Sequence, residues 1–180
     1  MSSQQNFGRW MIVAAWVLML AMLTLLFSAW LERQNNPNRQ LRVSTDLQDG
    51  SSLVLKRNRA GHYVAPGKIN GVEVVYLLDT GATLVAVSSE LAEKAGLQPG
   101  APGQSRTANG VVRSWLTEID QLQLGPITMR NVKASILPNM PANEVLLGMS
   151  FLKYLKLQQQ GDELEISLPE YRCVQRQQTE

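Results

Sequence analysis

The residues best suited to chemistry in this 180-residue chain are the consecutive Asp79, Thr80 and Gly81. They follow one apolar run, residues 74–78, and precede another, residues 82–87. A carboxylate on a tight turn directly after a strand-like segment is costly to bury, but it is well placed to exchange protons with a substrate or a water. The pattern therefore predicts an acid–base site at residues 79–81.

Paired carboxylates offer one clear form of that chemistry. Two carboxylates about 3 Å apart cannot both ionise, so they share one proton. One then acts as general base on a water molecule while the protonated one polarises the carbonyl to be cleaved. The reaction needs no covalent intermediate, no metal and no cofactor. It does require two aspartates on closely approaching loops, and Gly81 suits such a loop because it has no side chain.

Three segments together resemble the retropepsin-like aspartic proteases, and most of all their single-span, membrane-anchored bacterial members. They are the stretch 77–83 around Asp-Thr-Gly, the stretch 107–110 (Thr-Ala-Asn-Gly) and the later Val145-Leu146-Leu147-Gly148 with Met149. The resemblance covers roughly residues 53–168. It implies an aspartic endopeptidase with a mostly β fold, a retropepsin-like acid-protease half-barrel with one or two short helices, preceded by one transmembrane helix.

The resemblance also implies roles for particular residues. Asp79 would be catalytic, and the Thr80 hydroxyl would bond across to the partner loop. The remaining expected site residues are the loop supports Thr80, Gly81 and Ala82, the flap or substrate-binding residues Ala108, Asn109 and Gly110, and the loop-packing residues Leu147 and Gly148.

Because the chain holds a single Asp-Thr-Gly, the second catalytic carboxylate must come from elsewhere. None of the other aspartates is followed by Thr-Gly or Ser-Gly; they are Asp46, Asp49, Asp120 and Asp162. We therefore expect a homodimer in which Asp79 faces Asp79 across a two-fold axis, with a peptide or protein as substrate. A membrane tether would favour pairing by raising the effective concentration of the copies.

The N-terminal region contains an apolar segment long enough to cross a membrane. Residues 10–31 include no charged residue, and as a helix they would be about 33 Å long against a hydrocarbon core of about 30 Å. Trp10 and Trp30 stand near the ends, where amphipathic rings favour the interface. A cleaved signal peptide is the alternative, but the apolar region is too long and Ser28-Ala29-Trp30 lacks the small residue that cleavage requires. We expect a retained anchor.

The flanking charges do not choose an orientation, because Arg9 precedes the span and Arg33, Arg39 and Arg42 follow it. We expect a single-pass protein of the bacterial inner membrane with the protease domain in the periplasm, the side being left open by these charges. The expected domains are a tail at 1–9, the helix at 10–31, a polar tether at 32–50, the protease domain at 51–168 and a polar tail at 169–180.

Short strand-like pieces separated by turn residues fill the region after the tether. Asn-Gly pairs at 70–71 and 109–110 predict two hairpins, because this dipeptide suits a two-residue hairpin turn. The expected helices are 90–95, capped by Ser88 or Ser89, and 149–154. The expected strands are 52–56, 61–69, 72–78, 105–113 in two arms, 119–124, 127–129, 132–137, 155–159 and 164–168.

Several other functions fit the sequence poorly. The net charge is +2 with both signs interspersed, so nothing indicates nucleic-acid binding. With one cysteine, Cys173, and one histidine, His62, a zinc site or a histidine-based triad lacks the necessary residues. A haloacid-dehalogenase-type phosphatase needs a second acid where Gly81 lies. The remaining alternative is a non-catalytic, dimeric peptide-binding or scaffold module of the same fold at the membrane.

Overall fold

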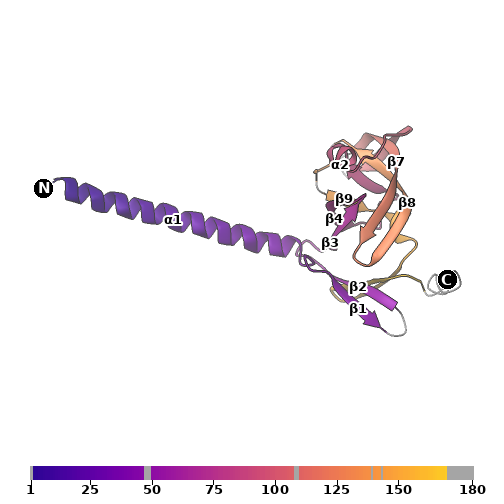
Figure 1. Cartoon of the computed structure of the whole chain (residues 1–180), viewed down its shortest axis with the longest axis horizontal. Coiled ribbons are helices and arrows are strands. Elements are labelled where there is room, and N and C mark those ends of the chain that lie inside the picture. The colour runs from indigo at the N-terminus through magenta and orange to yellow at the C-terminus, as the bar shows by residue number, and fades with distance from the viewer. Residues whose placement is uncertain (1, 47–49, 108–109, 139, 143, 170–180) are drawn as a thin grey trace. The chain divides into compact units, whose positions relative to one another are not determined.

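The computed structural model describes residues 2–46, 50–107, 110–138, 140–142 and 144–169, and the chain divides into two compact units, Met1–Asn36 and Pro37–Glu180 (Figure 1). The first unit is one helix, α1 (Ser2–Asn35), which extends beyond the predicted 10–31 at both ends. Its stretch Arg9–Ser28 is long and apolar enough to cross a membrane, and none of that stretch is buried.

The second unit begins with a small antiparallel sheet of four strands. Their order is β1-β2-β11-β10, so β1 and β10 form the two edges. The strands come from both ends of the unit: β1 (Arg42–Asp46), β2 (Gly50–Lys56), β10 (Lys156–Gln160) and β11 (Glu163–Ser167).

A seven-stranded sheet with order β3-β4-β9-β5-β8-β7-β6 forms the rest of the fold, and β3 also pairs with β7, which closes the sheet on itself. Within it, β9 pairs in parallel with β4 and β8 pairs in parallel with β5. Its strands are β3 (Val64–Ile69), β4 (Val72–Leu78), β5 (Val85–Ser88), β6 (Pro102–Thr107), β7 (Gly110–Leu124), β8 (Ile127–Leu137) and β9 (Glu144–Leu147).

Two short helices, α2 (Ser89–Lys94) and α3 (Met149–Leu152), complete the unit. The predicted mostly β fold with one or two short helices is confirmed. Ser88 caps α2, since its Oγ accepts a hydrogen bond of 3.0 Å from the Leu91 N–H. The turn between β3 and β4 is Asn70-Gly71, with φ of 48° and 85°, the left-handed conformation that a type I′ turn requires.

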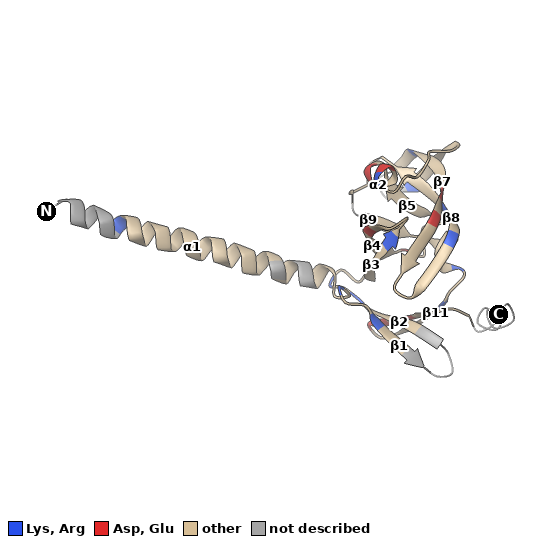
Figure 2. Ribbon diagram, viewed as in Figure 1, with Lys and Arg blue, Asp and Glu red and all other residues tan. Residues whose placement is uncertain are grey.

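One core serves both sheets. Leu53 and Leu55 of β2 and Ile166 of β11 belong to the same buried cluster as Tyr76 and Leu147 from the larger sheet. The inner face of the small sheet therefore packs on the closed sheet. In Figure 2, Lys and Arg (blue) and Asp and Glu (red) are interspersed over the strands of the second unit.

The segment 32–50, expected as a tether, differs from that expectation. Helix α1 continues through Asn35, and Arg42–Asp46 form β1. Asn38 is only 5% exposed: its Nδ2 donates to the carbonyls of Lys56 (2.8 Å) and Val64 (2.7 Å), and its Oδ1 accepts from the Lys56 N–H (2.7 Å). A buried side chain that satisfies backbone groups in this way attaches the segment to β2 and β3, which composition could not reveal.

Several further bounds differ from prediction. The second arm of 105–113 and the expected strand 119–124 form one strand, β7. The pieces 127–129 and 132–137 belong to one continuous strand, β8, which passes through Asn131 at φ 55°. The helix expected at 149–154 ends at Leu152. The C-terminal tail lies outside the described residues from 170 onward.

Candidate active site

The loop that carries Asp79 connects β4 to β5. Parallel pairing of β4 with β9 ends at Leu78 and Leu147, and the Asp79 N–H donates to the Leu147 carbonyl at 3.2 Å. The Ala82 N–H then donates to the Asp79 carbonyl at 3.2 Å, which closes a tight turn. The strand pairing thus fixes the position of Asp79 at the end of β4, and the turn fixes the course of the chain after it.

The Asp79 side chain takes part in that turn. Its Oδ1 accepts a hydrogen bond of 2.9 Å from the Gly81 N–H, the arrangement of an Asx turn. A Cβ at position 81 would lie 3.1 Å from the same Oδ1, closer than ordinary contact. Asp79 is half-buried, while Thr80 and Gly81 are exposed. The carboxylate is held in one orientation and is accessible to a ligand.

The start of α3 is hydrogen-bonded to the loop that carries Asp79. The Met149 N–H donates to the Ala82 carbonyl at 2.8 Å, and the Ser150 N–H donates to the Thr83 carbonyl at 2.9 Å. A Cβ at Gly148 would collide with the Leu84 carbonyl oxygen and lie 2.7 Å from that of Ala82. Leu147 is fully buried. The structure thus places Leu147 and Gly148 against the loop that carries Asp79.

Ser150 is a loop-supporting residue that sequence reasoning missed. Its Oγ accepts a hydrogen bond of 3.0 Å from the Val85 N–H, where the loop enters β5. A serine at the second residue of a short predicted helix carries no signal for this contact, because the partner lies far away along the chain.

The other aspartates that the structure describes belong to other elements of the fold. Asp46 ends β1, Asp120 lies within β7 and Asp162 lies in the turn between β10 and β11. Asp49 lies outside the described residues. Among the described residues, no group of three or more His, Cys, Asp and Glu side chains is placed to hold a metal ion.

The hairpin expected to be a flap is formed by β6 and β7. Thr107 pairs with Gly110, whose φ of 111° lies in the region that favours glycine. Ala108 and Asn109, the other two expected flap residues, lie outside the described residues. Val111, next to the turn, is 60% exposed. The hairpin thus presents an apolar side chain near its tip.

A cavity of about 290 Å³ lies beside the loop that carries Asp79, and Thr80 lines it. Its walls come from the loop region, α3 and the small sheet, a combination that the sequence did not suggest. The lining residues are Tyr63, Leu78, Thr80, Leu152, Leu157, Gln159 and Leu164.

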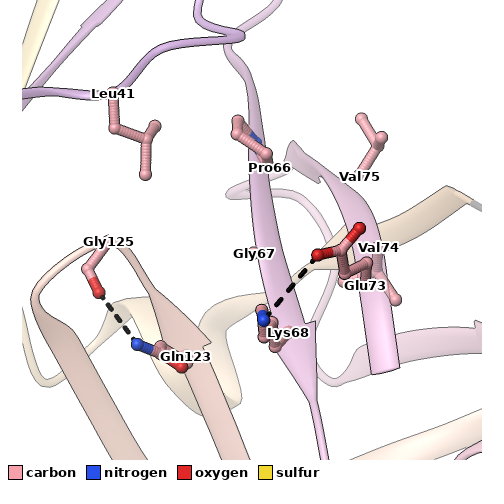
Figure 3. Close-up of a pocket in the computed structure, with 9 residues that line it drawn as sticks. All are labelled: Leu41, Pro66, Gly67, Lys68, Glu73, Val74, Val75, Gln123 and Gly125. Carbon is pink, nitrogen blue, oxygen red and sulfur yellow. Dashed lines mark hydrogen bonds and ion pairs between the residues drawn. The ribbon is translucent and has the colours of Figure 1, made fainter. Parts of the chain in front are cut away.

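Another hollow, of about 490 Å³, lies between β3, β4 and the β7–β8 turn, and Asp79 does not line it (Figure 3). Its ionisable residues are Lys68 and Glu73, which form an exposed pair at 3.7 Å, and Gln123 Nε2 donates to the Gly125 carbonyl at 3.4 Å. An exposed ion pair in an apolar hollow supplies no nucleophile or free base, so this hollow is a weaker candidate for chemistry.

Tyr76 on β4 is structural. Burial raises the pKa of its hydroxyl above the usual range, and the hydroxyl donates to the Lys68 carbonyl at 2.8 Å. A Cβ at Gly67 would collide with the Tyr76 ring and the Gln123 carbonyl. The glycine therefore allows β3, β7 and this ring to approach closely.

Comparison with known proteins gives consistent results. The model of the family described as "gag-polyprotein putative aspartyl protease" matches residues 65–154. An uncharacterised protein of Sinorhizobium sp, described by its position in the cobV 5' region, is 30% identical over an alignment 179 residues long, and the match covers 92% of this chain and 77% of that protein. An uncharacterised protein of Rickettsia prowazekii (strain Madrid E) is 29% identical over 108 residues, 58% of this chain and 46% of that protein.

Among solved structures, the crystal structure of a retropepsin-like aspartic protease from Rickettsia conorii superposes with a TM-score of 0.54. It is 24% identical and covers 72% of this chain and 94% of its own. This likeness shows that the fold is retropepsin-like.

Proposed function

The chain belongs to the gag-polyprotein aspartyl protease family, and we propose that it is a membrane-anchored aspartic endopeptidase that acts as a homodimer. One observation carries the proposal. Asp79 is held by the Gly81 N–H on a loop fixed to β9 and α3, yet it remains partly accessible. A costly half-buried carboxylate in so constrained a loop is what paired-aspartate chemistry requires.

The reaction follows from two such loops. One copy contributes one Asp79, and the second copy contributes the other. The ionised carboxylate accepts a proton from a water molecule, which attacks the carbonyl carbon of the substrate. The protonated carboxylate donates a hydrogen bond to the carbonyl oxygen as negative charge develops there. The β6–β7 hairpin covers the bound peptide, which we propose to be extended.

The apolar stretch Arg9–Ser28 supports membrane anchoring. The relatives from Sinorhizobium and Rickettsia support a bacterial setting, and we place the helix in the inner membrane. We propose that the unit after Asn36 lies in the periplasm. Protease digestion of spheroplasts tests this side: external protease should remove that unit from intact spheroplasts, and full protection would contradict the placement.

The test of catalysis compares the full chain in detergent with two variants that each lose one carboxylate. Asp79→Asn should abolish cleavage of a peptide library read by mass spectrometry. Asp120→Asn, on an exposed position of β7, should leave it unchanged. An inhibitor whose hydroxyl mimics the tetrahedral intermediate should block the wild-type chain. Equal cleavage by wild type and Asp79→Asn would instead favour contamination or the non-catalytic binding module.

Mixing tests the shared site directly. If each dimer needs two Asp79 carboxylates, a ten-fold excess of Asp79→Asn copies should pair with most wild-type copies and lower their activity about ten-fold. The same excess of the double variant Asp79→Asn, Asp120→Asn should act identically, since Asp120 has no part in pairing. Activity that is insensitive to the excess would show that one copy suffices.

A further inference from the structure

The first half of β8 has a free edge within the larger sheet. β7 pairs with residues 127–136 of β8, whereas β5 pairs only with residues 134–137. Among the strands that the structure describes, residues 127–133 therefore have β7 on one side and no strand on the other. A free strand edge presents backbone N–H and C=O groups to which another extended segment can add.

A hollow of about 470 Å³, the β8 hollow, lies along this free edge. It is lined by residues 128–133 of β8 on one side and by Ser150, Lys153 and Tyr154, in or just after α3, on the other. Successive side chains of a strand point to opposite faces of the sheet. A hollow that six consecutive residues line therefore follows the edge of the strand rather than one of its faces.

The β8 hollow carries uncompensated positive charge. Arg130, Lys133 and Lys153 line it and are exposed, and no Asp or Glu is among its described lining residues. Glu118 of β7 lies opposite Lys133 in the strand pairing, yet none of the three cations forms an ion pair within the part of the chain that the structure describes. The Lys153 ammonium lies 4.9 Å from the centre of the Tyr154 ring, a contact that leaves its charge in place. The β8 hollow therefore suits an anionic ligand.

The left-handed backbone of Asn131 exposes both cations of β8. On a regular strand, residues three apart point to opposite faces. Asn131 has a φ of 55°, and the alternation changes there: Met129 and Val132 are both buried, while Arg130 and Lys133 are both exposed. Both charges are thus accessible to a ligand at the free edge.

The free edge favours a peptide over other anions. A phosphate offers acceptors only, so it leaves the carbonyl groups of the edge without donors. An extended peptide offers N–H and C=O groups in alternation, which match both kinds of group on β8. Residues 170–180 of this chain hold two arginines and two glutamates, so its own C-terminal tail does not supply an acidic segment.

We propose that an extended acidic segment of another protein adds to the free edge of β8. Its backbone pairs with residues 128–133, and its carboxylates accept charge-assisted hydrogen bonds from Arg130, Lys133 and Lys153. Asp79 does not line the β8 hollow. The binding is therefore separate from the proposed catalysis and does not depend on it.

Fluorescence anisotropy tests the binding with the full chain in detergent. The probe is a labelled peptide in which glutamate alternates with valine. One comparison peptide has glutamine in place of each glutamate and lacks the charge. A second keeps the glutamates but is N-methylated at every backbone amide, so it cannot donate hydrogen bonds to a strand edge. Only the unmodified acidic peptide should bind tightly, and added salt should weaken it.

Variants of the chain test the assigned residues. The double variant Arg130→Gln, Lys153→Gln removes one charge from each wall and should raise the dissociation constant at least ~5-fold. Lys133→Glu, which reverses one charge, should have an effect at least as large and serves as the second variant if the double variant does not fold. Lys156→Gln is the matched control, since Lys156 is exposed and does not line the β8 hollow; it should change binding less than ~2-fold. Thermal unfolding shows whether each variant keeps its fold.

Each remaining outcome would contradict the proposal. Failure of the acidic peptide to bind, or equal binding by wild type and the charge variants, would exclude the β8 hollow as its site. Equal binding of the N-methylated peptide, or binding of inorganic polyphosphate but not of the peptide, would indicate an anion site without strand addition. Asp79→Asn should bind the peptide as the wild-type chain does, and a loss of binding would place the peptide at the proposed active site instead.

Discussion

Asp79 is joined to Leu147 by a backbone hydrogen bond of 3.2 Å from its N–H to the Leu147 carbonyl. The bond extends the parallel pairing of β4 with β9 by one residue, beyond Leu78 and Leu147. The carboxylate therefore emerges where a buried strand ends, and the glycine after Leu147 begins the support beneath the loop. This contact sets the position of the candidate catalytic residue, and the N–H groups of Met149 and Ser150 support its loop.

The first prediction concerns that glycine. Gly148→Ala should lower the free energy of unfolding by about 2 kcal/mol or more, because the added methyl meets backbone carbonyls that cannot rotate away. Its φ of −87° suits alanine, so the cost arises from the close approach alone. Denaturant unfolding measures it. Gly103→Ala is the control, since its added carbon would lie 3.6 Å from Ser114 Oγ, an ordinary contact; equal effects of the two changes would contradict the explanation.

The second prediction concerns Asn38. Asn38→Ala removes three hydrogen bonds and leaves backbone groups of Lys56 and Val64 without that partner, so we expect a loss of about 2–3 kcal/mol in unfolding free energy. Gln40→Ala, at an exposed neighbouring position, should cost less than about 0.5 kcal/mol. Thermal unfolding of both variants and of the wild-type chain measures these losses of stability. If Asn38→Ala behaves like Gln40→Ala, this side chain does not fix the segment before β1.

The third prediction concerns stability in alkali. Because burial raises the pKa of Tyr76 in the folded state, the unfolded state releases this proton first, and stability falls as pH rises beyond about 10. Tyr76→Phe removes this ionisable hydroxyl. Above this pH, the unfolding free energy of the variant should therefore fall less steeply than that of the wild-type chain. At neutral pH the lost bond to the Lys68 carbonyl should cost about 1 kcal/mol. If the unfolding free energies of the two proteins fall equally steeply above about pH 10, the ionisation of Tyr76 does not cause the loss of stability.

The fourth prediction concerns the pH dependence of cleavage. A pair of carboxylates that shares one proton works only in its singly protonated form. The rate of peptide cleavage by the full chain should therefore give a bell-shaped profile with its optimum on the acidic side. Initial rates from acid to alkaline pH measure the profile. A rate that stays level over this range would count against a shared pair.

Local patterns in the sequence predicted much of the fold. Val72–Leu78 forms β4 with the predicted bounds, Asn70-Gly71 makes the predicted turn, and Ser88 caps α2. These features depend on neighbours within a few residues, so the local sequence specifies them. Asn38 shows the limit, because a polar residue in a polar segment gave no sign that its amide would bind the backbone of β2 and β3.

The sequence by itself determined the chemistry on offer: one Asp-Thr-Gly after an apolar strand, a glycine after a second apolar strand, and an apolar N-terminal segment. The tertiary structure decided which residues share a site. It joined Asp79 to β9, placed Ser150 under the loop, and set Gln159 in the same cavity as Thr80. These contacts link residues far apart along the chain, and such contacts are fixed only when the strands pair and the two sheets close on one core.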